Sequence, residues 1–329
     1  MIHAYVPRNG RMERVEQIKG APLPADALWL DVVAPTSEER AQVNAAYGLT
    51  LPTVEEVREI EPSDRLYVEG GARFMTATIL VHADAPLPDR ASMTFIVTTR
   101  GLITLRYVEP RPIATYAQRL MRGTDVCTCG EDALTGLLEA FIDRIADILE
   151  KTAQDLDQVS HAIFAEEAKG SRRRPQQDLR AIIRSLGRSD DLISTIRESL
   201  LSMTRLISFF TATLQGVSEK NLKDVKARLK SARNDILSLG EHAAFESHTV
   251  NFLLDATLGM INIEQNGIIK IFSVAAVVFL PPTLVASIYG MNFDFMPELH
   301  WLAGYPWALG LMAISAIIPL IYFHRKGWL

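Results

Sequence analysis

The spacing of hydrophobic residues changes character along the chain. Up to about residue 130, short apolar runs alternate with turn residues, a pattern typical of strands joined by tight turns. From residue 131 onward, apolar residues recur every three or four positions, which predicts long helices. After residue 268, charged side chains almost disappear. The pattern therefore predicts an α+β domain, followed by long helices and by a strongly apolar C-terminal segment.

Residues 1–130 carry strand and turn signals. The run ALWLDVVAP reads as a buried strand, and the following PTSEERAQVNAAYGL has a helix N-cap at Thr36 or Ser37. RLYVEGGARFMTATILVHA and SMTFIVTTRGLITLRYV read as two strand pairs that turn at Gly70-Gly71 and at Arg100-Gly101. We expect a sheet with flanking helices. The N-terminus lacks the basic start and apolar core of a signal peptide, so we expect this domain in the cytoplasm.

Three long helices are predicted next. Residues 131–217 contain two of them, folded back on each other, joined by the basic connection KGSRRRP, in which Pro175 suits a first-turn position. The third begins near Ser218 and meets no proline before Pro281. We expect a stalk helix over 218–268 that continues into the apolar segment. A helix this long is rarely stable alone, so it must pack against copies of itself or a membrane.

Two apolar runs, 269–290 and 305–323, are each long enough to cross a hydrocarbon core of about 30 Å. A pair of buried core helices is the alternative, but little chain remains to bury them. Lys270 directly precedes the uncharged stretch of the first run, which begins at Ile271, and a basic tail, 324–329, follows the second run. The loop 291–304 has no Lys or Arg. The positive-inside rule then places both termini in the cytoplasm and the loop outside. Aromatic residues at the edges of the runs fit interfacial belts: Trp301, Tyr305, Trp307, Tyr322 and Trp328.

Three prolines, Pro281, Pro282 and Pro319, lie inside these runs. Membrane helices tolerate proline where neighbouring helices or water satisfy the freed carbonyl groups, here those of Val277 and Val278. We expect a kink or a water-lined wall at this level.

A polar stripe follows one face of the first span. Two spans cannot enclose a pathway, so any pore must come from several copies of the chain. Alternating steps of three and four residues along the helix reach a set of positions rich in amide and hydroxyl side chains. The alternative to a pore lining is that these residues only allow helices to pack closely. A straight helix drifts against this stepping, so the stripe is continuous only in a supercoiled bundle. The stripe contains Asp255, Gly259, Asn262, Asn266, Ile269, Ser273, Ala276, Leu280, Thr283 and Ser287.

Apolar residues interrupt this stripe. Ile269 and Leu280, with Phe272 beside Ile269, would form apolar constrictions along the otherwise polar stripe. Rings of such residues from several copies can close a pore by excluding water.

The loop sequence SIYGMNFDFMPELHW, residues 287–301, supplies oxygen ligands at the end of the stripe. Several copies of Asn292 would form a ring of amide oxygens, and Gly290 would allow close backbone approach or an unusual turn. Mg²⁺ gives up water reluctantly, so we expect Asn292 to hold the ion through its waters. Asp294 and Glu298 would concentrate cations there. Apart from His300, the loop and stripe lack Cys and His, which favours a hard divalent cation.

The segment YGMNFDFMPEL, residues 289–299, resembles the signature of the CorA family of bacterial magnesium and cobalt transport channels, in the GMN motif superfamily. The resemblance extends to the whole layout of the chain. It implies a homopentameric, funnel-shaped channel of the bacterial inner membrane, with five first spans around the pore and Gly290, Met291 and Asn292 as selectivity filter. The positions that would line the pore are Asn266, Ile269, Phe272, Ser273, Leu280, Thr283 and Ser287.

The resemblance also implies that Mg²⁺ is both substrate and regulatory ligand, because acidic residues at cytoplasmic subunit contacts bind it and hold such channels shut. Asp255 falls at one such position and is the candidate; a solvated stalk acid is the alternative reading. One departure is SEKNLKDVKARLKSARND, which is net basic where a strongly acidic helix is expected. A solvated coiled-coil face is the role we expect for its lysines and arginines.

Several classes of function are disfavoured. The net charge of −5 gives no indication of nucleic acid as a partner. Cys127 and Cys129 are too few for a closed zinc site, and we expect a reduced pair in a loop before a helix. No Walker motif and no recognisable catalytic arrangement is present, so we expect no enzyme.

The leading hypothesis is a passive channel for Mg²⁺ influx, with Co²⁺ and Ni²⁺ as further cargo and closure by internal Mg²⁺. A zinc transporter of the same superfamily is the first alternative, although FMPEL favours the magnesium branch. The second alternative is a non-conducting, membrane-anchored coiled-coil receptor.

Overall fold

The structure is a computed structural model that describes residues 1–8, 10–16, 21–59, 61–85, 88–164, 176–214, 219–292 and 296–328. The chain divides into two units, Met1–Leu254 and Asp255–Leu329. Helix α7 contributes to both units, because it runs from Glu219 to Tyr289.

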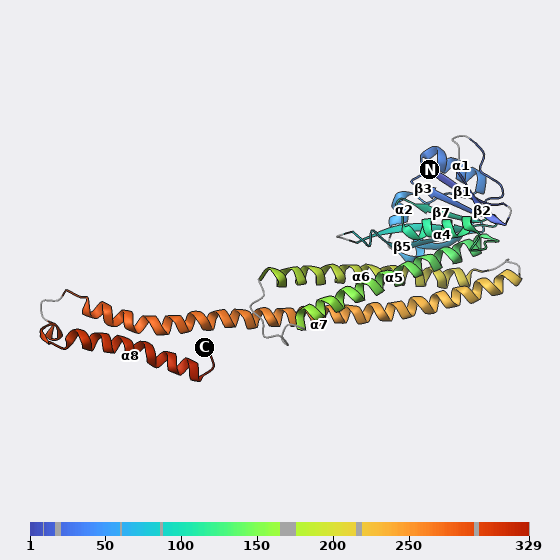
Figure 1. The fold of residues 1–329 in the computed structure, drawn as a ribbon. Coiled ribbons are helices and arrows are strands. Elements are labelled where there is room, and N and C mark those ends of the chain that lie inside the picture. Colours follow the sequence, from blue (N-terminus) through green and yellow to red (C-terminus); the bar gives the residue numbers. More distant parts are fainter. Residues whose placement is uncertain are drawn as a thin grey trace. The chain divides into compact units, whose positions relative to one another are not determined.

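A seven-stranded sheet forms the middle layer of the α/β region of the first unit, in the order β2-β1-β3-β7-β6-β5-β4 (Figure 1). Only β3 and β7 pair in parallel among these neighbours. The two predicted strand pairs, with turns at Gly70-Gly71 and Arg100-Gly101, are confirmed as antiparallel pairs. The strands are β1 (Ile2–Arg8), β2 (Arg11–Glu16), β3 (Trp29–Val33), β4 (Leu66–Glu69), β5 (Ala72–Val81), β6 (Asp89–Val97) and β7 (Leu102–Arg106).

Helices cover both faces of this sheet. α1 (Ser37–Tyr47) begins at Thr36, whose hydroxyl accepts a hydrogen bond from Glu39 N while the Glu39 carboxylate accepts one from Thr36 N, so Thr36 is the N-cap and the capping box is complete. The other helices of the α/β region are α2 (Val54–Arg58), α3 (Pro62–Arg65) and α4 (Arg111–Arg122).

Side chains of β3 alternate between two cores. Leu30 and Val32 face a core that includes Val43 of α1 and Val57 of α2. Trp29 faces the opposite core, where its ring lies 5.7 Å from that of Tyr116 on α4. This alternation follows from the period of two along a strand and explains why the strand is apolar at nearly every position.

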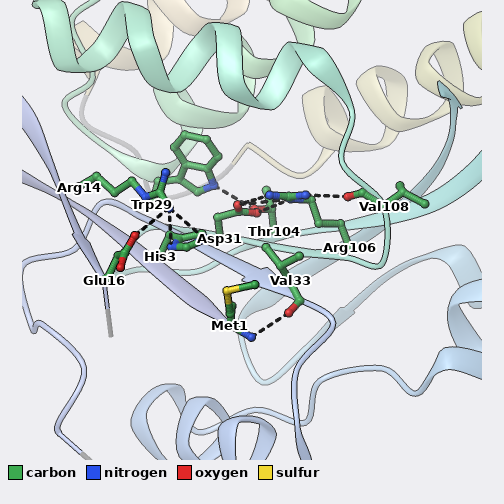
Figure 2. Close-up of polar contacts among 10 residues, drawn as sticks. All are labelled: Met1, His3, Arg14, Glu16, Trp29, Asp31, Val33, Thr104, Arg106 and Val108. Atoms are coloured by element: carbon green, nitrogen blue, oxygen red, sulfur yellow. Dashed lines mark hydrogen bonds and ion pairs between the residues drawn. The ribbon is translucent and has the colours of Figure 1, made fainter. Parts of the chain in front are cut away.

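Asp31 and Arg106 form a buried ion pair on the α4 face of the sheet (Figure 2). Arg106 Nη2 lies 2.9 Å from Asp31 Oδ2, and Arg106 Nε lies 3.0 Å from Asp31 Oδ1. Thr104 donates to Asp31 at 2.8 Å and accepts from the Trp29 indole at 3.0 Å. Because both charges are almost fully buried, their mutual hydrogen bonds are what make this burial tolerable.

Two long helices, α5 (Gly130–Phe164) and α6 (Gln176–Ala212), follow the α/β region and contact the sheet through β5, β6 and β7 (Figure 1). The prediction of two packed long helices is confirmed, whereas Pro175 and the connection KGSRRRP lie outside the described residues. Gly130 begins α5 directly against the β6–β7 turn. A Cβ atom at this position would lie 2.6 Å from the carbonyl carbon of Gly101, so only glycine fits.

The net basic start of α7 is only partly the solvated face that we expected. Lys223, Lys226 and Lys230 are exposed. Arg228 is half-buried, and its Nη2 lies 2.6 Å from Glu139 Oε2 on α5. This ion pair raises the pKa of Arg228. One of the basic residues of the segment therefore links α7 to α5.

Cys127 and Cys129 precede α5 as free thiols, as predicted. Burial raises the pKa of the Cys127 thiol to about 12, which makes it unreactive at neutral pH.

The second unit consists of α7 from Asp255, a short 3-10 helix η2 (Pro297–His300) and α8 (Gly304–Arg325). α8 lies beside the C-terminal part of α7 (Figure 1), and Lys270 Nζ of α7 lies 5.7 Å from the ring of Trp328, just after α8.

Candidate ion pathway

Among the described residues, two helices are long and apolar enough to cross a membrane, α7 and α8. Only 6% of the apolar window of each is buried by the rest of the described chain. In water, so much exposed apolar surface would be strongly unfavourable, whereas lipid or further copies of the chain would cover it. α8 contains the whole of the predicted span 305–323, and α7 contains residues 269–289 of the predicted span 269–290.

One face of α7 is shielded within the second unit. Val274 is buried, and Val278 and Val285 are half-buried. Ala308 of α8 is also buried, which identifies α8 as the element that covers this face. At about 100° per residue, the predicted polar stripe lies roughly on the far side of α7 from these valines.

The structure leaves every predicted stripe residue exposed. Among the apolar members, Ile269 is 60% and Leu280 is 66% exposed, and Phe272 beside them is 72% exposed. The polar and small members are exposed as well: Asp255, Gly259, Asn262, Asn266, Ser273, Ala276, Thr283 and Ser287. The stripe is therefore one open face of a single helix, and closing it around a lumen requires other chains.

The double proline does not end α7, which continues through Pro281 and Pro282 to Tyr289. Neither proline has an N–H group, so the carbonyls of Val277 and Val278 lose their usual helical donors. Immediately after the prolines, the Thr283 hydroxyl donates to the carbonyl oxygen of Phe279 at 2.7 Å.

Gly290 closes the helix by close backbone approach. Its N–H donates to the Ala286 carbonyl oxygen at 2.9 Å, and an added Cβ would lie 3.1 Å from that oxygen. Gly290 does not have a positive φ, so of the two expected alternatives, close backbone approach is the one that its geometry favours. The helix ends here with its carbonyl oxygens near the loop.

Met291 and Asn292 follow the helix end and are exposed. Asp294 lies outside the described residues. Glu298 belongs to η2, but its side chain lies outside the described part of the structure. The structure therefore brings Gly290, Met291 and Asn292 together at the end of the stripe.

Asp255 is exposed. Within the described ranges, no group of three or more His, Cys, Asp or Glu side chains is close enough to hold a metal ion. A metal site at Asp255 would thus need ligands from a neighbouring copy.

Comparison with known proteins decides the family. The family described as CorA-like Mg2+ transporter protein matches residues 24–325. The chain belongs to this family. The magnesium transport protein CorA of Pasteurella multocida (strain Pm70) is 37% identical over 330 residues and covers 100% of both chains. CorA of Haemophilus influenzae (strain ATCC 51907 / DSM 11121 / KW20 / Rd) is 35% identical over 333 residues, again over 100% of both.

The CorA fold is also shared. The complete structure of the CorA magnesium transporter from Methanocaldococcus jannaschii matches with a TM-score of 0.76, covering 100% of this chain and 99% of that one, at 16% identity. This likeness confirms the predicted α+β domain, long helices and two apolar C-terminal helices as a CorA fold.

Proposed function

We propose that this chain is one subunit of a channel that carries Mg²⁺ into the cell, with Co²⁺ and Ni²⁺ as further cargo. The observation that carries the proposal is the exposed polar stripe of α7, which lies away from α8 and ends at Gly290, Met291 and Asn292. Membership of the CorA-like family supports Mg²⁺ as the cargo.

The filter would work on the hydrated ion. The waters around Mg²⁺ point their hydrogens outward, so a ring of Asn292 amide oxygens can accept them without stripping the ion. Asp294 and Glu298 would raise the local cation concentration at the mouth. The membrane potential contributes roughly 2.3 kcal/mol per charge per 100 mV, and a dication receives twice that.

The pore would be formed by five copies of α7. The resemblance to the family supports this number, and the open stripe supports the need for several copies. Asn266, Ser273, Thr283 and Ser287 would offer oxygen to the ion's waters. Ile269, Phe272 and Leu280 would narrow the lumen and, when dry, block it.

Closure would depend on internal Mg²⁺ bound between subunits at Asp255. Carboxylates are the ligands that Mg²⁺ prefers, and the exposure of Asp255 leaves it accessible to a neighbouring copy. Mg²⁺ is thus cargo and regulator, and we assign no enzymatic activity to the chain.

The proposed topology places both termini in the cytoplasm of a bacterial cell and the spans in its inner membrane. Lys270 and the basic tail on one side, and the absence of Lys and Arg from the loop on the other, support this orientation. The proposed organisation is 1–130 α/β domain, 131–217 helices, 218–268 stalk, 269–290 first span, 291–304 external loop, 305–323 second span and 324–329 tail.

Flux into liposomes tests the function. The purified protein is reconstituted, a potential is imposed, and Mg²⁺, Co²⁺, Ni²⁺ and Zn²⁺ are offered separately. We expect Mg²⁺ influx into liposomes that contain the wild-type protein and no influx into empty liposomes. A preference for Zn²⁺ over Mg²⁺ would identify the zinc branch instead. No flux of any metal through a correctly assembled protein would favour the receptor.

A further inference from the structure

The residues after α8 form an ordered turn rather than a loose tail. The N–H of Trp328 donates to the Phe323 carbonyl oxygen at 3.0 Å, and that of Gly327 donates to the His324 carbonyl oxygen at 3.1 Å. Gly327 has φ +69°. These two bonds around a left-handed glycine are the Schellman motif, and the rings of Trp328 and Phe323 stack at 5.3 Å, the apolar contact that accompanies it.

The turn places the indole of Trp328 near two ammonium groups. Lys270 Nζ, at the start of the first span, lies 5.7 Å from the ring centroid, and Lys326 Nζ lies 5.5 Å from it. Both distances fall within the range of cation–π attraction. The cluster, which we name the tail cluster, consists of Lys270, Lys326 and Trp328.

Within the part of the chain that the structure describes, the positive charge of the tail cluster has no carboxylate partner. Among the described residues, no carboxylate lies within ion-pair distance of Lys270, Arg325 or Lys326. An indole face offsets only part of the repulsion between two cations, because it carries no net charge. The arrangement therefore favours an anion beside the ring.

The position of the tail cluster indicates which anion. Lys270 stands among the first residues of the apolar run of α7, and Lys326 directly follows helix α8. Tryptophan and lysine at such a level lie among lipid headgroups, where their apolar parts stay in the acyl region and their polar ends reach the phosphates. A basic pocket between two spans on the cytoplasmic side suits an anionic headgroup.

We propose that the tail cluster binds the phosphate of an anionic phospholipid in the inner leaflet, and that this lipid links the start of the first span to the end of the second. The proposal rests on the proposed membrane topology. It does not require that the chain conducts Mg²⁺.

Native mass spectrometry of the delipidated, detergent-solubilised assembly tests it, with added phosphatidylglycerol, phosphatidylcholine or inorganic phosphate. We expect retention of phosphatidylglycerol over phosphatidylcholine. The double variant Lys270→Gln/Lys326→Gln should retain at least about fivefold less phosphatidylglycerol than the wild type, since each lysine near anionic lipid contributes appreciably to binding. Lys230→Gln, an exposed lysine on the same helix, is the matched control and should retain wild-type binding. Equal retention in the double variant and the wild type would overturn the proposal.

A second variant separates charge from geometry. Gly327→Val keeps both lysines but strains the left-handed turn that positions Trp328, and we expect reduced lipid retention with an intact assembly. If inorganic phosphate protects the protein from thermal unfolding as well as phosphatidylglycerol does, the site is one for free phosphate and the lipid proposal fails.

A labelling experiment distinguishes failure of this proposal from failure of the proposed function. Lys326→Cys in sealed vesicles should react with an impermeant maleimide only from the cytoplasmic side, whether or not Mg²⁺ flux is observed. Labelling from the outside would refute the inner-leaflet assignment even if flux is normal.

Discussion

The hydroxyl of Thr283 donates its hydrogen bond to the backbone carbonyl oxygen of Phe279, 2.7 Å away, one turn back along α7. The one proton of the hydroxyl is thereby used within the helix, so the oxygen presents only lone pairs to its exposed side. Waters around a dication offer hydrogens, not lone pairs. Thr283 therefore faces the proposed lumen with the polarity that a hydrated cation requires.

Thr283→Val should reduce Mg²⁺ influx, because valine keeps the shape and removes the acceptor. A loss of about tenfold corresponds to roughly 1.4 kcal/mol in the transport barrier. Thr283→Ser retains a hydroxyl that can make the same bond and should conduct nearly as well as the wild type. Liposome flux, with size-exclusion chromatography to check assembly, measures both. Wild-type flux through Thr283→Val would remove Thr283 from the pathway.

Asn292→Ala should abolish Mg²⁺ selectivity or flux, because each subunit loses the amide oxygen at the proposed filter. Asn251→Ala is the matched control, since Asn251 is also an exposed asparagine on the α7 helix but bonds its own helix at Ser247. Competition between Mg²⁺ and monovalent cations in the flux assay reports selectivity. Unchanged selectivity in Asn292→Ala would favour the receptor hypothesis over the channel.

Asp255→Lys should raise the internal Mg²⁺ concentration at which flux stops, because it replaces a ligand with a repelling charge. Asp235→Lys makes the same charge change at an exposed position of the same helix and should leave closure unaltered. Flux recorded against a series of internal Mg²⁺ concentrations gives the half-closing value. The same value in Asp255→Lys and the wild type would make Asp255 a structural acid.

Arg106→Met should destabilise the α/β domain strongly, because it leaves the Asp31 carboxylate buried without its partner. Removing one member of a buried pair costs about 3–5 kcal/mol. The double variant Asp31→Leu/Arg106→Met should recover much of this loss. Arg8→Met breaks the ion pair with Glu13, in which both side chains are 59% exposed, and should cost only about 0–1 kcal/mol. Thermal unfolding of the full chain compares the four proteins, and equal losses for Arg8→Met and Arg106→Met would contradict the buried role.

Glu246→Gln should stabilise the protein at alkaline pH. Burial raises the pKa of Glu246 above its usual 4.5, and Asp157 adds to this, while His242 opposes it. The folded carboxyl group keeps its proton to higher pH than the unfolded one, so stability declines as pH rises from 4.5 through the folded pKa. The gain in Tm for Glu246→Gln should therefore be largest near about pH 8 and shrink toward about pH 5. Glu241→Gln, at an exposed position, should show no such dependence.

Local patterns in the sequence predict most elements of this fold, but not the order of the strands. The hairpin β1–β2 was missed because four of the six residues of β2 are charged and obscure its strand pattern, although the Asn9-Gly10 pair between the strands is a turn signal. The pairing of β3 with β7 joins residues some seventy positions apart, and no local period encodes it. For the same reason Asp31 and Arg106 appear in the sequence only as isolated polar residues in apolar strands.

The exposed face of the candidate pathway was easier to predict than the strand order, because the periodicity of a helix is a local property of the sequence. The exposure of the stripe from Asn262 to Ser287 follows from the spacing that predicted it, as does its separation from Val274 on the α8 face. The lumen itself could not be predicted from one chain, since other copies must close it. The contact of Lys270 with Trp328 was not predicted either, because it depends on the turn at Gly327.

The meeting of Gly130 with Gly101 limits how the protein can be recombined with its relatives. A Cβ at position 101 would lie 2.5 Å from the Leu28 carbonyl oxygen, and one at position 130 would lie against Gly101 itself. The start of α5 thus contacts the β6–β7 turn through backbone atoms alone. A larger residue at position 130 would push α5 away from the turn, and one at position 101 would collide with the Leu28 backbone. Chimeras that exchange the segment from α5 onward must carry glycine on both sides, and a crossover within α5 avoids disturbing this contact.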